Sequence, residues 1–167
     1  YQKGGSRSNK NEAMAIVNEI ERRLSDEKLR KLSIGVISFN VQQQYLIEDL
    51  LEARMEKNKQ LKVWAEESGE PIFIKNLENV QGDERDVILF SIGYGPDKDG
   101  KISMNFGPLN LTGGERRLNV AVTRSRYEMM VFSSLHAKDI DLRRSNAKGV
   151  QGLHRFLDYA ENGTLIE

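Results

Sequence analysis

The sequence has 167 residues, the length of one domain with a buried core rather than of two domains. Lys plus Arg and Asp plus Glu both number 25, so no overall positive field attracts nucleic acid or an anionic membrane. The chain has no cysteine and only two histidines, which excludes disulfides and thiol nucleophiles and leads us to expect no metal site. No apolar run reaches the length of a membrane span, and cysteine-free composition suits a reducing compartment, so we expect a cytoplasmic location without membrane contact.

The first third of the chain predicts a helix, a strand and a second helix. Residues 1–10 are polar and glycine-rich, as in a loop or linker. The first helix follows from five apolar residues at helical spacing: Ala13, Ile16, Val17, Ile20 and Leu24. Residues 33–39 are apolar at both alternate sets of positions, which is typical of a parallel strand covered on both faces. The helical period returns over residues 41–58, so strand and helix form the first half of a crossover unit.

The remaining elements repeat this alternation. Further buried strands are predicted at 71–76 and 86–92, and a fourth strand at 127–134, with a helix over 113–126 between the last two. A final helix is predicted over 150–163, ended by its glycine. We therefore expect one domain over the whole chain, folded as a three-layer α/β/α sandwich with a mostly parallel sheet. Binding sites in such sheets lie at the carboxyl ends of the strands.

Residues 95–101, GPDKDGK, have the glycine and lysine spacing of a phosphate-binding loop. Ile102 follows the lysine, whereas magnesium binding requires Ser or Thr there, and no helical period follows. We therefore predict a polar hairpin turn between two short extended runs, with Gly100 at the position of positive φ.

Hydrogen-bonding side chains crowd the end of the first strand. Ser38, Asn40 and Gln43 lie in the loop and the first turn of the next helix, where uncharged donors suit phosphate oxygens. The alternative is that Asn40 only caps the helix and the glutamines face solvent.

The polar segment 78–86, ENVQGDERD, joins two predicted strands. Its carboxylates permit a metal-nuclease interpretation, although Arg85 within the cluster favours a solvated acidic loop. Gly82 allows a backbone to approach a ligand closely, and Gln81 offers both a donor and an acceptor.

The third polar segment, GGERRLNVAVTRSR, is rich in arginine and has no lysine. If it is helical throughout, Leu118, Ala121 and Val122 form its buried stripe, while Arg117 and Arg124 project on nearly one line, roughly 10 Å apart. Guanidinium groups grip phosphates bidentately, and the alternative is a solvated basic helix surface.

These three segments, in this order, resemble motifs IV, V and VI of the second, C-terminal RecA-like domain of superfamily 1 DNA/RNA helicases. IGVISFNVQQQYLI is similar to motif IV, NLENVQGDERDVILFS to the Asp-Ser-x-Gln-Gly-x-Glu-x-Asp core of motif V, and GGERRLNVAVTRSR to the Arg-Arg-x-Asn-Val-Ala-x-Thr-Arg-Ala core of motif VI. SNKNEA resembles the Asn-x-x-Glu-Ala that opens this domain. The resemblance covers most of the chain and is closest to the branch that includes nonsense-mediated-decay helicases.

The resemblance implies roles for individual residues. Arg124 would be the arginine finger that reaches the γ-phosphate, and Arg117 would support it. Glu84 would lie near the nucleotide ribose. Gln81 and Gly82 would couple the nucleotide site to the nucleic-acid groove.

For the single strand, the resemblance implies contacts at four positions. Gln43 occupies the glutamine position of motif IV, and Ser38 and Asn40 stand where the family has Thr and Tyr. Asn79 replaces the serine of motif V, and Glu78 its aspartate. These departures from the family pattern affect the predicted contacts with single-stranded nucleic acid more than the predicted role of Arg124.

The implied partners are single-stranded DNA or RNA and an N-terminal RecA-like domain of the same parent chain. That domain would carry the phosphate loop and hold most of the ATP and Mg²⁺ contacts, so this chain alone is expected to be inactive. The sequence begins with Tyr1, and we expect it to be part of a longer protein. The alternative function is a catalytically inactive α/β module for protein interaction or nucleic-acid binding.

Overall fold

The centre of the computed structural model, which describes residues 8–163, is a sheet of four strands in the order β2-β1-β3-β4. Every neighbouring pair is parallel. The strands are β1 (Ile34–Ser38), β2 (Phe73–Asn76), β3 (Arg85–Ser91) and β4 (Ser125–Phe132). Parallel neighbours require crossover connections, and helices supply them.

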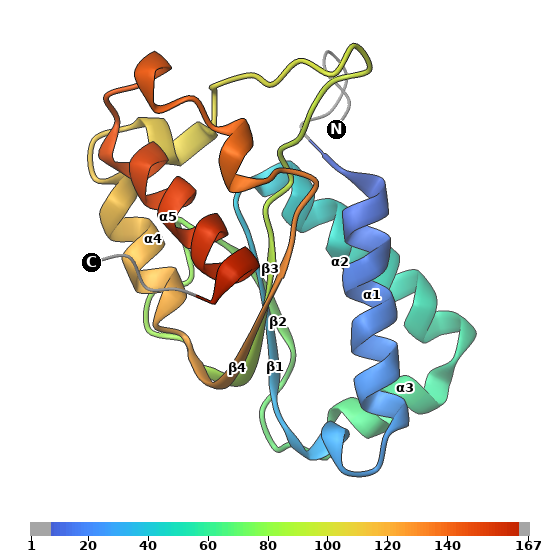
Figure 1. Ribbon diagram of the computed structural model, residues 1–167. Helices are drawn as coiled ribbons and strands as arrows, with labels where there is room; N and C mark the ends of the chain where they lie inside the picture. The colour runs from blue at the N-terminus through green and yellow to red at the C-terminus, as the bar shows by residue number, and fades with distance from the viewer. Residues whose placement is uncertain (1–7, 164–167) are drawn as a thin grey trace.

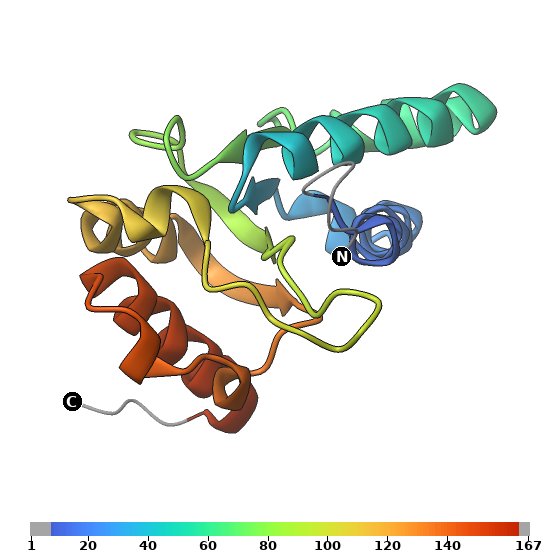
Figure 2. The same ribbon diagram turned by 90° about the horizontal axis from the view of Figure 1, so that it is seen from above.

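Helices cover both faces of the sheet (Figures 1 and 2). One face carries α1 (Lys10–Ser25), α2 (Val41–Lys57) and α3 (Lys59–Ala65). The opposite face carries α4 (Gly114–Val122) and α5 (Lys148–Asn162). Short 3₁₀ turns lie at Leu29–Lys31, Gly107–Asn110, Ala137–Asp139 and Leu142–Arg144. The three layers confirm the predicted α/β RecA-like class.

Alternate residues of β3 face the two helical layers. Val87 and Leu89 belong to the core beneath α1 and α2, whereas Ile88 and Phe90 belong to the core beneath α4 and α5. Phe90 meets Phe156 of α5 edge to face, with ring centroids 5.2 Å apart. Burial on both faces explains why β1 and β3 are apolar at successive positions. The edge strand β2, predicted to be buried, is mostly half-buried, and β4 at the other edge has no buried residue.

All four strands and the helices α1, α2 and α5 lie where the sequence predicts them, within a few residues at each end. Gly163 caps α5 as predicted. The short helix α3 was not predicted, and Lys10, assigned to the linker, already belongs to α1. The rest of the predicted linker, apart from residues 8 and 9, lies outside the described residues.

The helix predicted over 113–126 is wrong beyond Val122. Thr123 is the C-cap of α4, and Ser125 already pairs with Arg85 of β3. Arg124 therefore lies between a helix and a strand, and not on a helical line with Arg117. The cause is non-local, because strand pairing with β3 competes with the local helical period. Val122, predicted to be buried, is half-buried.

The turn at 95–101 is confirmed, but it is not a β-hairpin. Asp97 N–H donates to Lys101 O at 2.8 Å, and Gly100 has φ of 77°. Glycine suits this position because its lack of Cβ removes the steric penalty of positive φ. Among the described residues no strand flanks the turn, and the next helical segment is the short 3₁₀ turn at Gly107–Asn110.

Candidate functional site

The predicted site residues lie in three parts of the fold. Ser38, Asn40, Gln43 and Asn79 lie at the carboxyl edge of the sheet, where β1 and β2 end. Gln81, Gly82 and Glu84 belong to the segment that returns to the amino edge, where β3 begins. Arg117 lies on α4, and Arg124 lies at the amino edge, directly before β4.

At the carboxyl edge, three of the predicted residues are buried. Ser38 Oγ donates to Asn40 O at 2.8 Å, and Asn40 Oδ1 caps α2 by accepting from Gln43 N at 2.9 Å. Gln43 donates through Nε2 to Asn9 O and to Ser91 Oγ, both at 3.0 Å, and accepts from Asn9 N at 2.7 Å. These side chains therefore join β1, α2, β3 and the start of α1.

Glu12 is a buried member of this edge that the motif interpretation did not assign a role. Its carboxylate accepts hydrogen bonds from Ser91 Oγ and Gly93 N, both at 2.7 Å. Burial raises the pKa of Glu12 to about 7, although these two hydrogen bonds oppose the shift. The signal was present in the sequence, since Glu12 is the glutamate of the SNKNEA segment.

Asn79, unlike the other three residues predicted to contact single-stranded nucleic acid, is exposed. Its Oδ1 accepts from Asn76 N at 2.9 Å, so its side chain closes the turn that follows β2. A small pocket of about 180 Å³ lies at this edge, lined in part by Asn40, Gln42 and Asn76. The carboxyl edge thus presents the polar side chains of Gln42 and Asn79 and the carboxylate of Glu78 over a buried, hydrogen-bonded support.

Asp83 holds the segment between β2 and β3 in place through two contacts. Its carboxylate forms an ion pair with Lys75 of β2, and its N–H donates to Val80 O at 3.3 Å. Gly82 has φ of 89° and no neighbour where a Cβ would lie, so the turn requires glycine for its backbone angle. Gln81 and Glu84 are exposed on either side of this turn.

Arg124 is held at the amino edge by neutral acceptors. Its Nε donates to Val120 O at 3.0 Å and its Nη2 to Thr123 Oγ1 at 2.9 Å. Its backbone carbonyl accepts from Arg85 N at 3.1 Å, which fixes it beside Glu84 and the start of β3. Within residues 8–163 its guanidinium forms no ion pair with a carboxylate.

Arg126, two residues further on, has the opposite environment. Its guanidinium donates to Glu70 Oε1 at 2.6 Å and Asp86 Oδ1 at 3.1 Å, and Glu84 lies 3.8 Å away. The hydrogen bonds from Arg126 lower the pKa of Glu70 to about 2. The irregular register between β3 and β4 at this point directs Arg126 toward these carboxylates. Its charge is therefore compensated locally.

Arg117 lies in the first half of α4 and is half-buried. Its Nη1 is buried without a hydrogen-bond partner in the described part of the chain. An unsatisfied buried donor is costly, so this group adds nothing to the stability of α4.

Residues 8–163 contain no group of three or more His, Asp or Glu side chains placed to hold a metal ion. None of their helices has the length and apolarity needed to cross a membrane.

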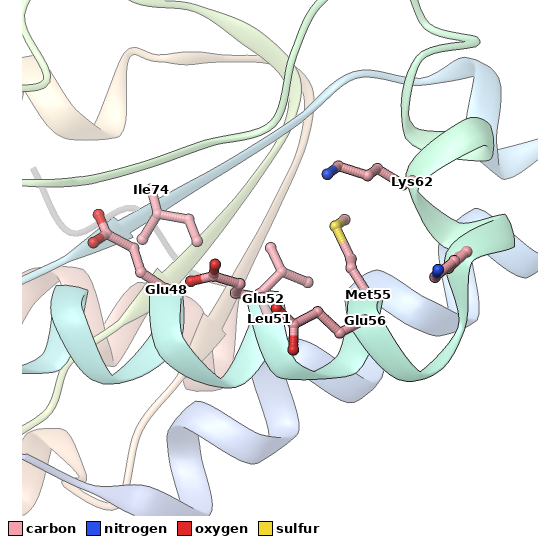
Figure 3. Close-up of a pocket in the computed structure, with 8 residues that line it drawn as sticks. Glu48, Leu51, Glu52, Met55, Glu56, Lys62 and Ile74 are labelled. Atoms are coloured by element: carbon pink, nitrogen blue, oxygen red, sulfur yellow. The ribbon is translucent and has the colours of Figure 1, made fainter.

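A groove of about 550 Å³ lies between α2, α3 and the free edge of β2, away from the predicted site (Figure 3). Leu51, Met55 and Ile74 line its apolar part. Glu48 and Lys62 stand at opposite ends of the view. None of the predicted site residues lines this groove.

A family model described as an AAA domain matches residues 1–136. Similar proteins include the uncharacterized ATP-dependent helicase MG140 of Mycoplasma genitalium, 38% identical over 158 residues, and its homolog in Mycoplasma pneumoniae, 39% identical over 162 residues. These matches cover 92% and 93% of this chain but 14% of each relative. They are consistent with a C-terminal helicase domain of superfamily 1, while the nonsense-mediated-decay branch stays a prediction. Since the family match covers most of an α/β RecA-like chain, the chain belongs to this AAA domain family and is a helicase-type domain.

Proposed function

We propose that this chain is the C-terminal motor domain of an ATP-dependent superfamily 1 helicase. In the full-length protein, it supplies Arg124 as an arginine finger to an ATP site that it shares with an N-terminal RecA-like domain. The names of the two similar proteins and the resemblance to motifs IV, V and VI support this proposal. The chain alone, without that second domain, would not turn over ATP.

The observation that carries the proposal is the contrast between Arg124 and Arg126. An arginine finger must keep its positive charge for the charge that develops on the transferred phosphoryl group. Arg124 meets this requirement because Val120 O and Thr123 Oγ1 orient it without neutralising it. Arg126 does not, because Glu70 and Asp86 already compensate its charge.

The neighbouring residues fit supporting roles in the same site. Glu84 is exposed beside the backbone of Arg124, where it could accept hydrogen bonds from a ribose. Gln81 and Gly82 lie in the segment that runs from the carboxyl edge, where the nucleic acid would bind, to the amino edge, so they are suited to couple the two sites. Arg117, half-buried on α4, would support this site from the helix that precedes Arg124.

ATP and Mg²⁺ would be held mainly by the N-terminal RecA-like domain. The described residues fit this division, because they offer exposed cationic donors for phosphate oxygens but no cluster of carboxylates for a cation. Bound Mg²⁺ supplies charge neutralisation for the β- and γ-phosphates. This chain would add the guanidinium of Arg124 to that neutralisation.

Single-stranded nucleic acid would bind along the carboxyl edge. Asn79 is exposed and can contact the strand directly. Ser38, Asn40 and Gln43 are buried, so we assign them the role of holding the end of β1 and the start of α2 in the binding shape. Whether the strand is DNA or RNA depends on contacts to the 2′-hydroxyl.

The proposal is tested by measuring ATP hydrolysis by the full-length protein in the presence of single-stranded nucleic acid. Arg124→Ala should reduce turnover by at least about a hundredfold, since arginine fingers contribute on the order of 10³ to 10⁵ in comparable enzymes. Arg124→Lys should restore little, because an ammonium cannot reproduce the planar fork of guanidinium. Melting temperature and strand binding without nucleotide should stay near those of the unchanged protein.

The control is Arg155→Ala, which removes an exposed arginine of α5 that lies outside the motif matches and forms no hydrogen bond or ion pair with a described residue. It should leave turnover unchanged. Near-normal turnover in Arg124→Ala, or a loss explained by unfolding, would refute the finger assignment.

A further inference from the structure

The connection between α4 and β4 contains a small hydrogen-bonded cycle around the guanidinium of Arg124. Thr123 Oγ1 donates to Val120 O at 2.8 Å and accepts from Arg124 Nη2 at 2.9 Å. Arg124 Nε donates to the same carbonyl oxygen at 3.0 Å. The cycle thus ties the guanidinium to the last turn of α4 through one carbonyl and one hydroxyl.

The direction of the Thr123 hydroxyl follows from these contacts. Its single hydrogen points to Val120 O, so only its lone pairs face Arg124. The helix carbonyl therefore orients the hydroxyl, and the hydroxyl orients the guanidinium. Both acceptors are neutral, which leaves the full charge of Arg124 available to a phosphate.

The hydrogen-bonded cycle also leaves unused the N–H groups at the end of the guanidinium, which are the ones that bind phosphate. A guanidinium carries five N–H groups, and the cycle uses one on Nε and one on Nη2. Both hydrogens of Nη1 and one of Nη2 remain, and these form the end-on fork that grips two phosphate oxygens. A side chain with several rotatable bonds is thereby held in one orientation before a ligand arrives, which removes part of the entropic cost of binding.

From this geometry we infer that Thr123 is a positioning residue for the arginine finger. Its hydroxyl aims the guanidinium of Arg124 out of the domain toward the γ-phosphate and touches neither the nucleotide nor the nucleic acid. This inference rests on the proposed function, because it requires that Arg124 act on the phosphate.

The test uses two substitutions in the full-length protein. Thr123→Val is nearly isosteric and removes the hydroxyl, whereas Thr123→Ser keeps it. Thr123→Val should lower kcat for strand-stimulated ATP hydrolysis by about tenfold, the effect of one lost orienting hydrogen bond to a charged group. KM for ATP should change by less than about twofold, since most ATP contacts belong to the other domain. Thr123→Ser should restore kcat.

A second measurement separates positioning from a general structural effect. In an Arg124→Ala background, Thr123→Val should reduce turnover no further, because the group that it positions is gone. A further drop there, or equal losses in Thr123→Val and Thr123→Ser, would overturn the inference. The melting temperature of each variant identifies unfolding, and Thr123→Ala serves as a second hydroxyl-free variant if Thr123→Val is unstable.

The outcomes also distinguish this inference from the proposed function. If Arg124→Ala abolishes turnover but Thr123→Val does not lower it, the finger stands and the positioning role is wrong. If Arg124→Ala retains normal turnover, the proposed function fails and this inference fails with it.

Discussion

The two edges of the sheet use polar side chains in opposite ways. At the carboxyl edge, Gln43 and Glu12 are buried and their hydrogen-bonding atoms are satisfied by other parts of the chain. At the amino edge, Arg124 is oriented by neutral acceptors and forms no ion pair with a carboxylate of the described residues. The residues that resemble helicase motifs therefore differ in role between the two edges. Those at the carboxyl edge hold the backbone in place, whereas Arg124 at the amino edge offers its positive charge to a ligand.

This difference separates what mutations should change. Substitutions at the carboxyl edge that leave buried donors or acceptors without partners should lower the free energy of unfolding. Substitutions of Arg124 or Thr123 should lower turnover at constant stability. This difference between the two edges can be tested by substitutions, of which the one with the largest expected effect on stability is at Gln43.

Gln43→Leu should destabilise the chain by about 4 kcal/mol, because Asn9 N, Asn9 O and Ser91 would lose hydrogen-bond partners in a buried site. Urea unfolding measures the change. The control is Gln42→Leu, at the exposed neighbouring position, which should have little effect. Equal stability of the two variants would show that the carboxyl edge does not depend on its buried network.

The second prediction concerns the pH dependence that Glu12 gives to stability. Its pKa is about 7 in the folded chain and 4.5 for an unperturbed glutamate, so the folded state holds the proton more tightly. This contribution is fully present below pH 4.5, is lost as pH rises, and stays lost above pH 7. The total loss is about 3 kcal/mol at most.

Glu12→Gln removes this ionisation while Oε1 can still accept from Ser91 and Gly93. The variant should therefore gain stability relative to the original chain at pH 8, and much less at pH 5. Urea unfolding at both pH values provides the comparison. A stability difference that is the same at pH 5 and pH 8 would contradict the raised pKa.

Local patterns predicted the strands and most of the helices, but neither α3, the end of α4 nor the contacts within the site. The central strands were predictable because β1 and β3 are apolar toward both layers, and the end of α5 because Gly163 stops it. The end of α4 was not, because TRSR contains neither Gly nor Pro, and pairing of Ser125 with Arg85 decides where the helix stops. The contacts of Glu12 with Ser91 and Gly93 join positions about 80 residues apart, beyond any local period.

The smallest predicted effect is that of Arg126→Met, which retains an apolar stem but removes the guanidinium held by Glu70 and Asp86. The charge of Arg126 is already compensated, so turnover by the full-length protein should fall by less than about threefold. Partly exposed ion pairs contribute little to stability, so melting should shift by about 3 °C or less.

Salt gives this prediction a second readout. Added salt screens exposed charges, so the melting difference between Arg126→Met and the original chain should shrink as ionic strength rises. Arg116→Met, at an exposed arginine whose side chain has no described ion pair, should show no such dependence. The comparison of Arg124 with Arg126 depends on charge compensation. If Arg126→Met lost turnover as severely as Arg124→Ala while remaining folded, compensation by Glu70 and Asp86 could not be what distinguishes the two arginines.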